Sequence, residues 1–217
     1  MRALPLALGG GLLAYALVRR PRGSLSAPAI PLTSLDGSWT WPVPRWNGRT
    51  PTISDGFGSP RPGGTRHGGV DLMFARTGAD SFNPGSANAS KAFVMPDGMS
   101  AIAASDASVW SAMKTPRGYA VVLDHGPRKV ATFYTHLEKL LVKETASGKS
   151  GERVRIGQPI GVIGADPLDS QHLKHLHFEI WIGGPGDAVD PAPFLRQWAS
   201  VTDPNALLAR NAGFSYR

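Results

Sequence analysis

Short apolar runs separated by turn residues dominate the second half of the chain. Five of these runs have the length of strands: AIAAS at 101–105, YAVVLDH at 119–125, KVATFYTHL at 129–137, PIGVIG at 159–164 and LHFEIWI at 176–182. Runs of this length, rich in β-branched and aromatic residues and bounded by Gly, Pro, Asn or Asp, are typical of β-strands. Helical periodicity is first found in PFLRQWASV, near the C-terminal end. The pattern therefore predicts a predominantly β, antiparallel domain.

One polar segment interrupts this pattern. Residues 76–95, RTGADSFNPGSANASKAFVM, are rich in Gly, Asn and Ser and contain no long apolar run. A loop of this length is longer than an ordinary connection, and such loops tend to be functional or mobile. We expect it to lie near the functional site.

The N-terminal segment has a different composition from the rest. Residues 3–18 carry no charge but are fewer than the roughly 20 residues that cross a bilayer as an untilted helix. RRPR follows directly, and the first small-residue cleavage site lies further on at 26–29, so a hydrophobic anchor helix is favoured over a cleaved signal. The predicted organisation is an anchor or signal-like segment at 1–22, a Pro/Ser/Gly-rich linker at 23–50, a domain at 51–196 and a tail at 197–217.

Charge and cysteine content restrict the partners. The formal net charge is +7 and the sequence pI is near 10.1, which favours polyanionic partners such as wall polymers, anionic lipid or nucleic acid. The basic residues do not alternate with aromatic residues in a recognisable nucleic-acid-binding module, so no nucleic acid partner is expected. Cysteine is absent, and any metal site must therefore use histidine and carboxylate ligands.

The segment RHGGVD places His67 and Asp71 four residues apart. In a straight strand these residues would be roughly 13 Å apart, whereas zinc ligands lie about 2.0–2.2 Å from the ion. The chain must bend between them if both bind one ion. We expect Gly68 and Gly69 to permit that bend, because glycine tolerates φ values that other residues avoid.

The segment KHLHFEIW contributes two more histidines. If it is a strand, His175, His177, Glu179 and Trp181 share one face, and the apolar residues between them share the other. His136 follows another strand-like run, VATFY. Each segment alone fits an ordinary polar residue. Together, two histidines and one carboxylate can form a three-ligand zinc site with an open fourth position, as in catalytic zinc sites.

The order of these motifs resembles a known family. ISDGFGSPR, HGGVD, VVLDHG, TFYTHL, GERVRIGQPIGVIG and HLHFEIW occur in the order found in the lysostaphin-type, or LytM-like, zinc metallopeptidases of bacterial cell walls, over residues 52–195. The resemblance implies a LytM-like antiparallel sheet with Zn²⁺ bound by His67, Asp71 and His177. It also implies that His136 and His175 act as catalytic residues without binding the metal.

The resemblance further implies hydrolysis of peptidoglycan, at its stem peptides or cross-bridges, by a zinc-activated water. The catalytic domain of an anchored enzyme would face the cell wall, in the periplasm or outside the cell. The positive flank at 19–22 conflicts with this orientation, because positive residues tend to remain in the cytoplasm.

Two alternatives remain open, and a third is disfavoured by the sequence. A bacteriophage lysin, either virion-associated or membrane-linked, would use the same chemistry. A non-catalytic wall-binding or activator module would be expected to lack some of the five site residues, yet all five are present. A lipoyl or biotinyl carrier domain would need an exposed lysine at a tight turn, and GERVRIGQPIGVIG offers none.

The chain departs from the family pattern in two respects. The insertion after Asp71 is longer than expected and predicts a reshaped or partly covered groove, and His172 is an additional histidine that we expect to be a solvated loop residue. His125, in the DHG turn, is expected to be structural.

Overall fold

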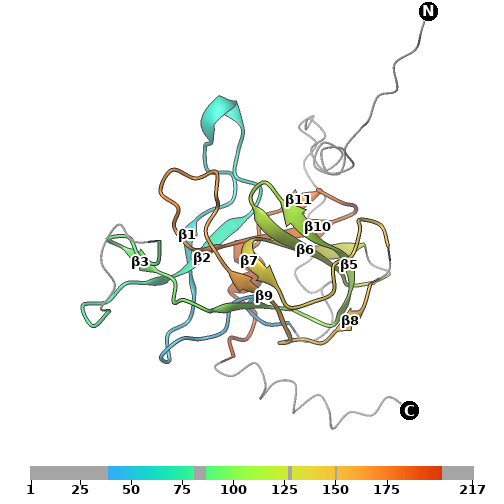
Figure 1. Cartoon of the computed structure of the whole chain (residues 1–217), viewed down its shortest axis with the longest axis horizontal. Helices are drawn as coiled ribbons and strands as arrows, with labels where there is room; N and C mark the ends of the chain where they lie inside the picture. Colours follow the sequence, from blue (N-terminus) through green and yellow to red (C-terminus); the bar gives the residue numbers. More distant parts are fainter. Residues whose placement is uncertain (1–38, 81–86, 127–128, 150, 202–217) are drawn as a thin grey trace, which may run out of the picture.

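The computed structural model describes residues 39–80, 87–126, 129–149 and 151–201. Within these ranges the strands form one sheet whose pairings are antiparallel, with β1-β2-β10-β7-β6-β5-β8 as its main order (Figure 1). The strands are β1 (Thr52–Asp55), β2 (Val70–Ala75), β3 (Phe93–Val94), β4 (Ser100–Ile102), β5 (Ala107–Thr115), β6 (Gly118–Asp124), β7 (Val130–Leu140), β8 (Arg153–Val154), β9 (Pro159–Ile163), β10 (Leu176–Ile182) and β11 (Ala188–Val189). The predicted antiparallel β architecture is confirmed.

The five strands expected from the sequence correspond to β4, β6, β7, β9 and β10. The run at 176–182 coincides with β10, and β7 extends three residues beyond the predicted end at 137. The longest strand missed is β5, ASVWSAMKT, in which small and polar residues interrupt the apolar pattern. β5 is nevertheless half buried because it pairs with β6 along most of its length.

The helix expected in PFLRQWASV is much shorter than its pattern suggests. The α-helix α2 covers Ala192–Leu195, and η2 (Pro62–Gly64) is a 3-10 turn in the loop before β2. Beyond α2, Arg196 and Gln197 form a turn, and Ala199 then forms a parallel bridge with Thr40. Pairing with the opposite end of the described chain therefore ends the helix early.

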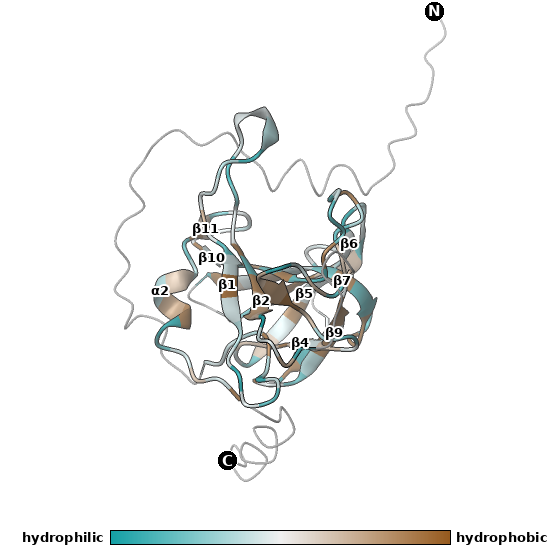
Figure 2. Cartoon of the chain, turned by 90° about the vertical axis from the view of Figure 1, so that its left-hand side faces the viewer, coloured by the Kyte–Doolittle hydropathy of each residue, from teal (hydrophilic) through white to brown (hydrophobic). Residues whose placement is uncertain are grey.

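The buried apolar side chains form one core cluster, and Figure 2 shows apolar colouring on β2. Along β10, Leu176, Phe178 and Ile180 are fully buried, as strand alternation predicts. Burying a side chain of this size contributes about 1.5–3 kcal/mol. This packing fixes the strand, so that His177 and Glu179 are held on the opposite face.

The two ends of the described chain meet. Trp39 stacks on Trp198 with ring centroids 4.9 Å apart, and the Trp41 amide donates to the Ala199 carbonyl at 2.9 Å. The predicted N-terminal hydrophobic segment lies outside the described residues, as does most of the predicted tail. Among the residues that are described, no helix is long and apolar enough to cross a membrane.

Candidate metal centre and catalytic groove

An open groove of about 690 Å³ lies over β2, β7 and β10. One wall comes from the loop between β1 and β2, which carries η2, and the other from the loop that leads from β9 into β10. The groove floor contains all five histidine and aspartate residues singled out from the sequence: His67, Asp71, His136, His175 and His177.

His67, Asp71 and His177 bring one ligand atom each to a common point. His67 Nε2 lies 2.8 Å from His177 Nδ1, and Asp71 Oδ1 lies 3.0 Å from each of these nitrogens. The register of the sheet explains the proximity, because His177 on β10 pairs directly with Asp71 on β2. Both histidines are buried.

The other nitrogen of each ring already has a partner. His67 Nδ1 donates to the Gly56 carbonyl at 2.9 Å, and His177 Nε2 donates to Glu179 Oε1 at 2.8 Å. A neutral imidazole that donates from one nitrogen presents a lone pair on the other. Two imidazole lone pairs and a carboxylate oxygen thus converge, and this donor set fits a zinc ion.

The electrostatics of the cluster agree with a site built for positive charge. Burial raises the pKa of the Asp71 carboxyl, but hydrogen bonds from His177 and His67 outweigh it, and the pKa falls well below its usual range. Burial lowers the pKa of His177, but the carboxylates of Asp71 and Glu179 outweigh this effect and raise it to about 9. Asp71 is therefore ionised, and the pair of carboxylates favours a cation at His177.

The chain bends at Gly68 and Gly69, as required to bring His67 beside Asp71. The expected reason is wrong, however, because neither glycine has a positive φ. Glycine is needed for close packing instead. A Cβ atom at Gly69 would overlap the Phe178 carbonyl oxygen, and one at Gly68 would lie 2.9 Å from Glu179 Oε1.

His136 and His175 form a second pair beside the metal ligands. Their ring centroids are 4.7 Å apart, and His175 Nε2 lies 3.8 Å from Asp71 Oδ1. Each Nδ1 donates to a backbone carbonyl, that of Arg117 at 3.1 Å for His136 and that of Leu173 at 2.7 Å for His175. Because backbone atoms hold both rings, Nε2 is the nitrogen left for chemistry in the groove.

His136 sits where the sheet is irregular. Its φ is 65°, which is rare for a residue with a side chain, and the β6–β7 and β7–β9 registers both shift next to it. Bulges of this kind re-aim a side chain, and strained backbone is concentrated at functional sites. Burial and the neighbouring His175 and His177 lower the pKa of His136 to about 3, so the ring is neutral at neutral pH.

Four groove residues were not singled out from the sequence. Arg61 lies 2.5 Å from Asp55 Oδ2 and 3.5 Å from Asp71 Oδ2, and Arg117 is ion-paired with the buried Asp166 next to His136. The Arg61 signal was present within ISDGFGSPR. The Arg117–Asp166 pair joins segments far apart in sequence, so no local pattern could have revealed it.

The insertion after Asp71 forms part of the groove. Ser90 and Phe93 line it, while the Lys174 amide donates to the Ala87 carbonyl at 2.6 Å and joins the insertion to the loop before β10. Residues 81–86 within the insertion lie outside the described ranges. The expectation of a reshaped groove is consistent with this wall.

The remaining histidines have other environments. His125 is held between the Asp106 carbonyl, at 3.0 Å from Nδ1, and Thr132 Oγ1, at 2.8 Å from Nε2. His172 has a φ of 47° and lies in an exposed turn, although its neighbours Gln171 and Leu173 line the groove. Neither residue is part of the five-residue cluster.

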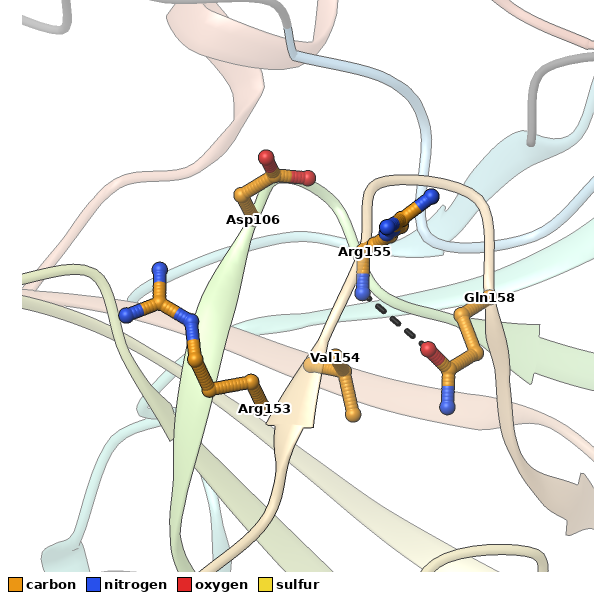
Figure 3. A pocket seen from close by; sticks show the side chains of 5 residues that line it. All are labelled: Asp106, Arg153, Val154, Arg155 and Gln158. Atoms are coloured by element: carbon orange, nitrogen blue, oxygen red, sulfur yellow. Dashed lines mark hydrogen bonds between the residues drawn. The ribbon is translucent and has the colours of Figure 1, made fainter. Parts of the chain in front are cut away.

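A second hollow lies at the other edge of the sheet, beside β8 (Figure 3). Its lining consists of Asp106, Arg153, Val154, Arg155 and Gln158, and the Arg155 amide donates to Gln158 Oε1 at 3.1 Å. It has no histidine, and its one carboxylate, Asp106, accepts a hydrogen bond from the Ile156 amide. Within the described residues, the five candidate site residues therefore lie in the groove over β2, β7 and β10 and not in this hollow.

Known proteins resemble this chain in sequence and in fold. The model of peptidase family M23 matches residues 87–191, a range that includes His136, His175 and His177 but not His67 or Asp71. The solved structure of LytU is 25% identical, with a TM-score of 0.50, and the match covers 69% of this chain and 87% of that one.

Two further structures share the fold at lower identity. Lysostaphin from Staphylococcus simulans is 24% identical, with a TM-score of 0.50, and the match covers 69% of this chain and 51% of that one. A complex of SpoIIIAH and SpoIIQ gives 22% identity and a TM-score of 0.53, with coverage of 72% and 99%. At these identities the likeness establishes the fold.

The fold and the histidine cluster define a peptidase-type β domain. Residues 87–191 match the model of peptidase family M23, and the described domain has a LytM-like fold.

Proposed function

We propose that this protein is a zinc-dependent endopeptidase that hydrolyses peptide cross-links of bacterial peptidoglycan. The observation that carries the proposal is the convergence of His67, Asp71 and His177 on one point of an open groove, next to two histidines that are held by backbone carbonyls. A site with three protein ligands and an open position is typical of catalytic zinc.

The five site residues have different proposed roles. His67, Asp71 and His177 would hold the ion, which supplies Lewis-acid chemistry by lowering the pKa of water and polarising a carbonyl. His136 and His175 contact the reacting groups. One of them accepts the proton from the attacking water, and the other stabilises the oxyanion or protonates the leaving amine. The lowered pKa of His136 keeps that ring neutral.

The substrate proposal has independent support. The groove is open along the sheet, and its walls present charged side chains from Arg61, Arg117 and Asp166 as well as apolar ones from Phe93 and Leu168. An extended peptide can lie in such a groove. The net charge of +7 favours the anionic surface of a cell wall. Lysostaphin, which shares the fold, is an antimicrobial peptidase.

We further propose that residues 3–18 attach the protein to a membrane with the peptidase domain facing the wall. The bacteriophage lysin remains a second setting for the same chemistry, and the charge bias around residues 3–18 fits a protein made in a host cytoplasm. Detection of the intact N-terminus in washed membranes would support the anchor. Its release by salt alone would contradict it.

Digestion of purified peptidoglycan tests the proposed function. The chain is incubated with peptidoglycans that differ in their cross-links, and the fragments are analysed by mass spectrometry, because new termini identify the cleaved bond. His177→Ala serves as the matched inactive control. We expect cleavage of a peptide bond by the unmodified chain and none by the variant. Undigested peptidoglycan of every cross-link type, with a zinc-loaded chain, would contradict the proposal and favour a non-catalytic wall-binding role.

A further inference from the structure

We propose that Glu179 is a positioning residue that fixes the ring of His177 and directs its Nδ1 atom toward the metal. This inference rests on the proposed zinc site. Glu179 Oε1 lies 2.8 Å from His177 Nε2, and Glu179 Oε2 accepts a hydrogen bond from Trp181 Nε1 at 2.6 Å. Both carboxylate oxygens are thus used by two ring N–H groups on the same strand.

The carboxylate is held from several sides. Trp181 is almost fully buried and stacks on Phe133, with ring centroids 5.3 Å apart and planes 17° apart. The Trp181 indole therefore has one position, and its N–H fixes one Glu179 oxygen. The other oxygen faces His177, whose ring it orients.

The glycine pair before β2 makes room for this carboxylate. A Cβ atom on Gly68 would lie 2.9 Å from Glu179 Oε1, and one on Gly69 would lie 2.8 Å from Glu179 Cγ. These distances are tighter than ordinary van der Waals contact. The two glycines of the RHGGVD segment therefore leave space for the Glu179 side chain, and they also form the bend that brings His67 to Asp71.

The consequence for His177 follows from its two nitrogens. Because Nε2 donates to Glu179, Nδ1 is the nitrogen that faces Asp71 and His67, at 3.0 Å and 2.8 Å. A carboxylate behind a ligating histidine fixes its tautomer and raises its basicity. Loss of such a partner commonly weakens metal affinity by about 10- to 100-fold.

Zinc affinity and the His177 ring signal test this inference in the full chain. The zinc dissociation constant is measured by competition with a chromophoric chelator, and histidine-labelled protein reports the His177 Nε2–H proton by NMR. For Glu179→Ala we expect zinc binding to weaken by about 10- to 100-fold and the Nε2–H signal to lose its protection from exchange. Glu144→Ala is the control, since Glu144 is exposed and should bind zinc as the unmodified chain does.

A conservative pair of variants separates positioning from general support of the fold. Glu179→Gln has one acceptor oxygen for two N–H donors, so zinc binding should weaken in this variant too. Adding Trp181→Phe removes the competing donor, and the double variant should bind zinc more tightly than Glu179→Gln alone, with the His177 signal restored. A purely structural role would make the double variant worse, because the smaller ring leaves a cavity.

Two results would overturn the inference. The first is an unchanged zinc dissociation constant in a folded Glu179→Ala or Glu179→Gln chain. The second is weaker zinc binding with an unchanged His177 Nε2–H signal and no recovery in the double variant. Either result would leave the proposed function intact if the unmodified chain binds zinc and cleaves peptidoglycan. Absence of zinc from the unmodified chain would instead refute the proposed function itself.

Discussion

His175, directly before β10, and His177, within β10, face the same groove, but different kinds of partner hold their rings. The Nδ1 atom of His175 donates to the Leu173 carbonyl at 2.7 Å, whereas His177 donates from Nε2 to the Glu179 carboxylate at 2.8 Å. The two rings therefore present opposite nitrogens to the groove. The position of the presented nitrogen also differs, because His177 Nδ1 is one of the three converging donor atoms, whereas His175 Nε2 lies 3.8 Å from Asp71 Oδ1.

Replacing His136 with alanine should abolish most of the activity without releasing zinc. The ring contacts His175 but is not among the three converging donors. Loss of an acid-base residue or an oxyanion donor commonly costs about 10²- to 10⁴-fold, so peptidoglycan hydrolysis should fall at least about 100-fold. Turnover and bound zinc are measured on the same sample. Near-normal turnover would remove His136 from the mechanism.

Gly69→Ala should destabilise the fold, whereas Gly78→Ala should not. The new methyl group at position 69 would overlap the Phe178 carbonyl, a backbone atom of a paired strand that cannot move aside easily. Overpacking of this kind typically costs about 1–3 kcal/mol or more. Gly78 has open space around it. Urea unfolding of both variants checks the difference, and equal stability would show that β2 and β10 are less tightly packed than described.

Stability should fall as the pH is lowered from about 6.5 to about 4, partly because of His125. Burial lowers the pKa of His125 to about 4 against an ordinary value of 6.5. The unfolded chain therefore binds a proton in this interval that the folded chain excludes, and stability rises with pH there. The contribution is fully present above pH 6.5.

His125→Gln isolates this effect. Urea unfolding gives the free energy of unfolding of each chain at pH 7 and at pH 4.5. The decrease between these two pH values should be smaller in the variant than in the unmodified chain. Other groups titrate alike in the two chains, so the difference reports His125. An equal loss would mean that this ring is accessible to protons in the folded protein.

Removing residues 1–22 should leave the zinc content and the peptidoglycan hydrolysis unchanged. The groove, its ligands and its supporting hydrogen bonds all come from residues within 54–181. The truncated chain should also lose its attachment to membranes. A truncated chain that aggregates or binds no zinc would show that the N-terminal segment contributes to the fold.

Sequence patterns predicted the parts of the molecule that depend on local periodicity. LHFEIWI alternates cleanly because one face is packed against the core, so β10 was located to the residue. β5 was missed because Ser108 and Ser111 interrupt its apolar run. The helix expected from PFLRQWASV was overestimated because pairing of Ala199 with Thr40 is a long-range effect.

At the candidate site, too, the sequence predicted the residues of the local motifs but not their tertiary contacts. The spacing of the histidines and the family resemblance named five residues that the structure brings together in one groove. The groups that hold these five side chains in place could not be predicted. Tertiary folding brings the Arg117 carbonyl and the Asp166 carboxylate to His136 from distant parts of the sequence. Gly68 and Gly69 were noticed for the wrong reason, since close packing against β10 is not visible in a linear sequence.

The zinc content of three purified chains tests the central claim most directly. Elemental analysis should find one zinc per chain in the unmodified protein and also in His175→Ala. It should find almost no zinc in His177→Ala, because a site reduced from three protein ligands to two binds zinc far more weakly. His177 lies in β10 and His175 directly precedes it, so a general disturbance of this segment would affect both variants alike. Retention of zinc by His177→Ala together with its loss from His175→Ala would contradict the assignment of ligands and catalytic residues.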